Sequence, residues 1–243
     1  MPNDGNHETG YRSLFSQPRM VQDLCRGFLR EEWIGWLDVD TLERLEGLGR
    51  ETPLDRLDEL LVWRLRWQGG SCWVYLLLNV QQEEDPFMAL RMGLYRELFY
   101  QDLLRRGVAV RLPVVVPVVL YHGKAPWQAA RDALELCLPL LPALQRHAPR
   151  TRYLLLEAAR DPIPETAGAD NLVSLLCRLE RSRTPEAVDG VLERLVALVS
   201  RPGDEDLRQA WSAFLGRSFL PRRFPHLFTP EMMEAWGAGG VLA

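Results

Sequence analysis

The chain has 243 residues, of which 47% are apolar and 26% charged. This composition is ordinary for a globular protein and excludes disordered, collagen-like and disulfide-scaffold classes, while the length suits one or two domains. The formal net charge is −4, so no overall positive field gathers nucleic acid, although a local basic patch can still bind it. Lys124 is the only lysine, so arginine supplies the remaining basic charge.

The four cysteines lie far apart in the chain, at positions 25, 72, 137 and 177. This spacing argues against a zinc knuckle or a redox pair and favours reduced, mostly buried thiols. Residues 1–10 are polar, and the longest apolar run, residues 112–121, is too short to cross a bilayer. We therefore expect a cytoplasmic protein that does not associate with membranes.

Apolar side chains recur at three- and four-residue steps over residues 18–37, which predicts a helix with Ser16 as its cap. A shorter segment at 39–49 follows without a clear type. Residues 60–67 and 71–81 are predicted strands, because two glycines between them supply the positive φ of a tight hairpin. We expect these two strands to pair antiparallel.

The clearest helix of the sequence follows the hairpin. Asp85 and Pro86 form a cap and first-turn pair, and Gly107 ends the helix. The helical stripe that we expect to be buried consists of Phe87, Leu90, Leu94, Leu98, Leu103 and Leu104.

The second half of the chain begins with two apolar runs and then becomes helical. Residues 114–120 and 153–157 are predicted strands, so the order of elements indicates an α/β sheet flanked by helices. Helices are predicted at 170–179, 185–199 and 204–215. We therefore expect a sheet domain at 1–160 and a helical C-terminal subdomain at 161–243. Five tryptophans are expected in the core: Trp33, Trp36, Trp63, Trp67 and Trp73.

Several short segments between residues 7 and 127 carry a resemblance to a known family. Each is weak alone, but their order and spacing together resemble the Rpn/YhgA-like family of recombination-promoting nucleases and transposase-like proteins. The matching pieces are His7, YRSLFS at 11–16, MVQDL at 20–24, Trp63 with Arg64, VYLLL at 74–78 with Gln81, DPFMALRMGLY at 85–95 and LPVVVPVVLYHG at 112–123.

The resemblance implies a restriction-endonuclease-like core of the PD-(D/E)xK class, an α/β mixed sheet that cleaves DNA with Mg²⁺ or another divalent cation. In such a site an aspartate and a glutamate on neighbouring strands hold the metal, and a third polar residue orients the attacking water. Gln81 matches the glutamine that this family usually has at the third position. The resemblance places the aspartate at Leu60 and the glutamate at Asn79, so both expected carboxylates are missing.

Asp58 is the best substitute for a metal-binding carboxylate. It shares a strand face with Leu60 but lies about 7 Å further back, and Asn79 offers one neutral oxygen. One interpretation is a metal and catalytic site built from Asp58, Asn79 and Gln81. The other treats all three as ordinary polar residues of an inherited pocket.

Three further residues are candidates for contacts with DNA or the pocket: His7, Arg91 and Lys124. Arginine suits phosphate recognition, and Lys124 follows a predicted buried strand. Each of the three residues is explained equally well as an ordinary surface residue without a functional role.

Two functional hypotheses follow from these residues. The first is a recombination-promoting DNA endonuclease, impaired by Leu60 and Asn79. The second is a non-catalytic DNA-binding or protein-interaction relative, that is, a pseudo-nuclease. DNA is the implied partner in the first, and a homodimer is compatible with both.

Overall fold

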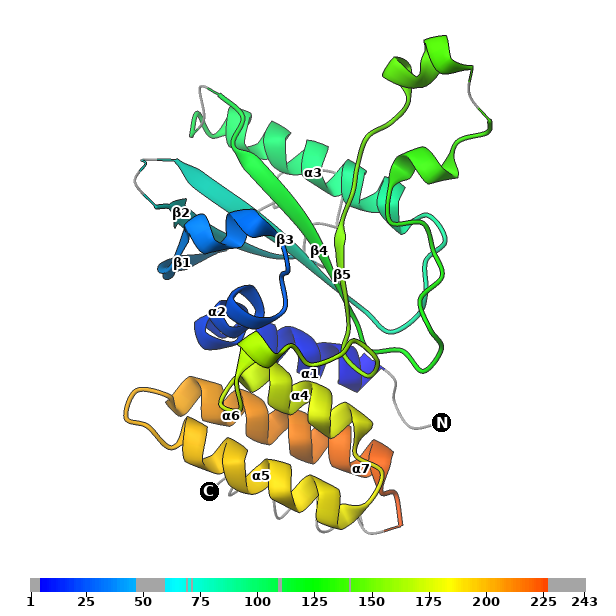
Figure 1. The fold of residues 1–243 in the computed structure, drawn as a ribbon. Helices are drawn as coiled ribbons and strands as arrows, with labels where there is room; N and C mark the ends of the chain where they lie inside the picture. The colour runs from blue at the N-terminus through cyan, green and yellow to red at the C-terminus, as the bar shows by residue number, and fades with distance from the viewer. Residues whose placement is uncertain are drawn as a thin grey trace. The chain divides into compact units, whose positions relative to one another are not determined.

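A computed structural model describes residues 5–46, 60–68, 70, 72–108, 111–139 and 141–226 (Figure 1). Two compact units divide the chain: residues 31–161 form one, and residues 1–30 with 162–243 form the other. We call them the sheet unit and the helical unit. This grouping differs from the sequence-based division at residue 160, because the first two helices pack with helices from the end of the chain.

The sheet unit contains one five-stranded mixed sheet in the order β1-β2-β3-β4-β5. The first three strands pair antiparallel, whereas β3, β4 and β5 run parallel. The sheet flanked by helices confirms the predicted fold class. The strands are β1 Leu37–Leu45, β2 Leu60–Trp67, β3 Trp73–Gln81, β4 Val114–Tyr121 and β5 Leu154–Glu157.

Helix α3 (Met88–Arg105) covers one face of the sheet (Figure 1). Its Met92 and Tyr95 side chains join a buried apolar cluster with Leu77 of β3 and Val119 of β4. The helix ends as predicted at Gly107, which has φ 64° and therefore adopts the left-handed conformation that glycine tolerates. Two short 3-10 turns follow β4, at Ala133–Leu136 and Pro142–His147.

The predicted buried stripe of α3 is wrong for most of its members. Phe87, Leu90, Leu94 and Leu104 are 45–61% exposed, and only Leu98 and Leu103 are buried. The segment carries a second stripe with equally good helical spacing, formed by Met88, Met92, Tyr95 and Phe99, and this stripe faces the sheet.

Three other sequence predictions also need correction. Ser16 does not cap a helix, because its hydroxyl donates to the Arg12 carbonyl at 2.7 Å. The helix predicted over 18–37 ends at Gly27, and a 3-10 turn (Glu32–Trp36) leads into β1. Trp63 is buried as expected, but Trp36 is 54% exposed and contacts Trp67 edge to face.

The helical unit joins both ends of the described chain. α1 packs against α6, and α2 packs against α4, so the predicted C-terminal helices are present together with two N-terminal ones. No helix in the described ranges is long and apolar enough to cross a membrane. The helices are α1 Gly5–Phe15, α2 Pro18–Gly27, α4 Leu172–Arg181, α5 Pro185–Val199, α6 Glu205–Phe214 and α7 Leu220–Arg223, with a π turn at Leu215–Phe219 and a 3-10 turn at Glu165–Ala167.

Candidate functional site

The structure brings together the positions at which the family resemblance places the two metal carboxylates. Leu60 of β2 and Asn79 of β3 are direct partners across the antiparallel ladder. Gln81 lies two residues after Asn79 and therefore on the same face of the strand. This face also carries Tyr75 and Leu77, so it is the face covered by α3. Asp58, the proposed substitute ligand, lies outside the described residues.

Leu60 belongs to the apolar cluster beneath α3 and is 7% exposed. Asn79 is 1% exposed, and its side-chain oxygen accepts a hydrogen bond from Gln81 Nε2 at 2.5 Å. The Asn79 amide nitrogen is buried and has no hydrogen-bond partner in the described part of the chain. A buried donor without a partner costs about 1–3 kcal/mol, so this position is not optimised for stability alone.

These residues do not fit a divalent metal. Leu60 has no donor atom, and the single oxygen of Asn79 is neutral and already occupied by Gln81. Mg²⁺ requires several oxygen ligands, normally with at least one carboxylate among them. Within the described ranges, no group of three or more histidine, cysteine, aspartate or glutamate side chains could hold a metal ion.

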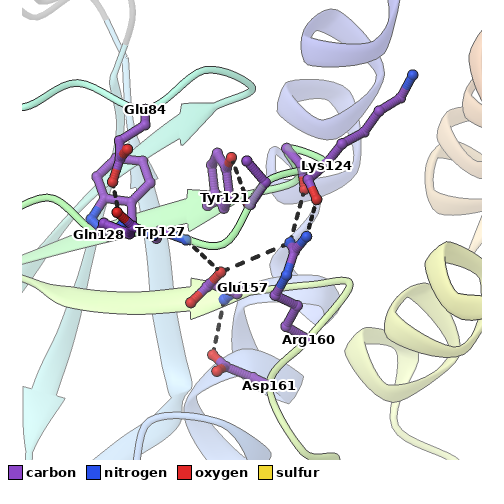
Figure 2. Close-up of polar contacts among 10 residues, drawn as sticks. Glu84, Tyr121, Lys124, Trp127, Gln128, Glu157, Arg160 and Asp161 are labelled. Atoms are coloured by element: carbon purple, nitrogen blue, oxygen red, sulfur yellow. Dashed lines mark hydrogen bonds and ion pairs between the residues drawn. The ribbon is translucent and has the colours of Figure 1, made fainter.

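Carboxylates do occur near the carboxyl ends of the parallel strands, but they bind backbone amides. Glu157 ends β5 in register with Tyr121 of β4, and its Oε2 accepts from the Trp127 N–H at 3.0 Å (Figure 2). Arg160 lies 3.9 Å from the same oxygen. Glu84 accepts from the N–H groups of Gln128 and Ala129. These acids hold the loop after β4 against the sheet.

In the same loop, the backbone of Gly123 lies very close to Tyr121 and Gln82. A Cβ at this position would lie 2.1 Å from Tyr121 Oη and 2.4 Å from the Gln82 carbonyl oxygen. Arg160 also holds this loop, because its guanidinium donates to the carbonyl oxygens of Gly123 and Lys124. Burial raises the pKa of Tyr121, whose hydroxyl donates to the Ala125 carbonyl at 2.9 Å. The loop is therefore held in one conformation by glycine and by paired polar groups.

The model of the family described as "Putative transposase, YhgA-like" matches residues 5–206. The chain belongs to this YhgA-like family. It is 24% identical over 124 residues to recombination-promoting nuclease RpnD of Escherichia coli O157:H7, a match that covers 50% of this chain and 48% of that protein. It is 22% identical over 195 residues to recombination-promoting nuclease RpnA of Escherichia coli strain K12, covering 80% and 65%. The chain thus spans less than two thirds of each relative. No solved structure matches it.

The other candidate residues of this YhgA-like chain lie in different surroundings. Lys124 is exposed, and its side chain extends away from the polar contacts of the loop (Figure 2). Arg91 lies on α3, where its Nε pairs with Asp85 Oδ2 at 3.2 Å. Both side chains keep an exposed part that an anion could contact.

His7 is buried in the helical unit rather than exposed. Its side chain is 3% exposed, with Nε2 3.1 Å from Glu180 Oε1 and Nδ1 against the Ser218 hydroxyl. Tyr11 donates to the same Glu180 oxygen at 2.9 Å. Burial, reinforced by the Glu180 charge, raises the pKa of Tyr11 well above its usual value. His7 therefore connects α1 to the C-terminal helices. Its predicted contact with DNA or the pocket stays a prediction.

Sequence reasoning missed the roles of Glu84 and Glu157. A glutamate at the last position of a buried strand was the available signal, because α/β proteins place functional and loop-anchoring groups at that edge. The partners of these acids lie 30–45 residues away in the chain, so spacing alone could not identify them.

Proposed function

We propose that this chain is a DNA-binding member of the YhgA-like family that does not hydrolyse phosphodiester bonds, a pseudo-nuclease on a PD-(D/E)xK-type core. One observation carries the proposal: Leu60 and Asn79 face each other at the two positions where the resemblance places metal carboxylates. A buried leucine and a neutral amide cannot supply the charge that holds Mg²⁺ and stabilises the reacting phosphate.

The contact between Asn79 and Gln81 supports this assignment. In the implied active site the third residue orients the attacking water. Here the Gln81 amide instead donates to Asn79 Oδ1, so the polar groups at this place bind one another.

The alternative is an active endonuclease in which Asp58 supplies the charged ligand beside Asn79 and Gln81. The names of the two relatives favour it, since both are called recombination-promoting nucleases. A partner protein in place of DNA is a further option for a non-catalytic relative.

The deciding experiment measures cleavage and binding together. The purified chain is incubated with supercoiled plasmid in Mg²⁺, Mn²⁺ or Ca²⁺, and binding to a labelled duplex is followed by fluorescence anisotropy. We expect binding without nicking above the level seen in EDTA. Metal-dependent cutting that is lost in Asp58→Ala but kept in Asp55→Ala establishes the endonuclease instead. Absence of DNA binding leaves the protein-interaction alternative, and sedimentation of the same sample tests whether the chain forms a homodimer.

A further inference from the structure

The described part of the helical unit contains a shallow surface cavity, largely open to solvent, of about 520 Å³ where α4 ends and α5 begins. Its volume is in the range typical of small-ligand sites, roughly 300–1,000 Å³. Three arginines line it: Arg178, Arg181 and Arg183. Two hydroxyl residues, Ser182 and Thr184, and three apolar residues complete the lining, and none of the lining residues is acidic.

We propose that this cavity binds a phosphate group, supplied either by the DNA backbone or by a free phosphate. Arginine presents a planar fork of N–H donors that matches two phosphate oxygens at once. Several arginines together with a hydroxyl donor suit a phosphate better than a carboxylate, which has only two oxygens.

Two of the three arginines, Arg178 and Arg183, have no acidic partner among the described residues. Arg178 and Arg183 form no ion pair or side-chain hydrogen bond in the described part of the chain. The acid between them in the sequence is Glu180, and its carboxylate is bound to His7 and Tyr11. Arg178 and Arg183 are therefore available to an anion, while Glu180 is used elsewhere and Glu186, in the first turn of α5, is not part of the cavity lining.

Helix ends alone do not explain this arrangement. Arg178 and Arg181 occupy the last turn of α4, where cations are generally favourable. Arg183 lies outside both helices, however, and also lines the cavity.

The start of α5 contributes little to anion binding. Pro185 has no N–H, and the N–H of Ala187 is capped by the Thr184 hydroxyl oxygen at 3.3 Å. The guanidinium groups are thus the principal donors, and the Thr184 hydroxyl keeps its own proton to donate.

The test uses the full chain and the double variant Arg178→Gln/Arg183→Gln. Its control is Arg201→Gln/Arg217→Gln, which removes two exposed arginines of the helical unit outside the cavity. Duplex DNA binding is measured by anisotropy over a range of salt concentrations, and inorganic phosphate binding by calorimetry. Unfolding midpoints confirm that all variants are folded.

We expect the cavity variant to lose about tenfold or more in affinity for one of the two ligands, because hydrogen bonds to charged groups are the strong ones. If DNA is the source, the slope of log K against log[salt] also becomes shallower by about 0.9 for each phosphate that the protein no longer neutralises. A loss confined to inorganic phosphate identifies a free phosphate as the source. Arg178→Lys/Arg183→Lys should retain the salt slope but not the full affinity, since lysine keeps the charge without the fork.

Equal affinities of the cavity and control variants for both ligands overturn the proposal. This outcome is separate from the failure of the proposed function, because plasmid cleavage tests the sheet unit and the arginine variants test a cavity of the helical unit.

Discussion

Carboxylates introduced at positions 60 and 79 should create a metal site where the described residues do not fit one. In Leu60→Asp/Asn79→Glu the two acids would face each other across the β2–β3 ladder. Leu60 is 93% buried (100 − 7), so its replacement forfeits about 1.5–3 kcal/mol of apolar burial. An unpaired buried charge adds to this loss. We expect the free energy of unfolding in EDTA to fall by about 3–5 kcal/mol.

A divalent cation should reverse much of this loss, because it binds the folded state and neutralises the paired carboxylates. At a metal concentration of about one hundred times Kd, the linkage relation gives about 2.7 kcal/mol of stabilisation. Urea unfolding with Mn²⁺ and with EDTA measures the difference, and calorimetry measures binding directly. The parent chain should show neither effect.

The matched control is Leu60→Asn/Asn79→Gln, which has nearly the same shape but no charge. It should be destabilised in EDTA and gain nothing from Mn²⁺. A folded Leu60→Asp/Asn79→Glu protein that binds no metal refutes the assignment of these two positions. Metal-dependent stabilisation of the parent chain would refute the conclusion that its residues do not fit a metal.

Further predictions concern the core and its titrating groups. Gly123→Ala should lower the free energy of unfolding by about 2–4 kcal/mol, because the added Cβ overlaps neighbouring atoms. Gly190→Ala should raise it by about 0.5–1 kcal/mol, because no atom lies within 4 Å of the added Cβ. Equal urea midpoints for the two variants would contradict this prediction. Burial raises the pKa of Cys25 to about 12, so a thiol reagent should label the exposed Cys72 first and Cys25 only after unfolding. Burial also raises the pKa of Tyr153 from 10.0 to about 12. The stability that the protonated Tyr153 contributes is therefore complete below the pKa of the unfolded chain and is lost as pH rises through 12. Tyr153→Phe should abolish this part of the alkaline loss of stability, measured by urea unfolding at several pH values.

The sequence predicts the central hairpin well because β2 and β3 are mostly apolar and two glycines lie between them. The predicted strand at 60–67 matches β2, and that at 71–81 contains β3. The residues of β1 carry no clear signal because this is an edge strand. Its nine residues, LDVDTLERL, mix acids with apolar side chains, and only Leu37 and Leu42 are buried. In a half-exposed edge strand the alternation of apolar and polar residues is too weak to identify the strand from the sequence.

Spacing within one strand or hairpin predicts the place of the candidate site, whereas contacts between distant segments are not predictable. The resemblance gives positions 60 and 79, the sequence predicts that their strands pair antiparallel, and the structure shows Leu60 and Asn79 as direct partners 19 residues apart. His7 illustrates the opposite case. Its partners Glu180 and Ser218 lie 173 and 211 residues away, so nothing local distinguishes a buried histidine from an exposed one.

The acidic residues around the strand ends have a structural role of their own. Glu84 and Glu157 each accept backbone N–H groups of the 127–129 segment, and Asp161 accepts the N–H of Glu157 (Figure 2). A metal that recruited one of these carboxylates would compete with the hydrogen bonds that hold the 127–129 segment. The acids nearest the strand ends are therefore the ones that hold the loop in place, and this role does not depend on which residues stand at positions 60 and 79.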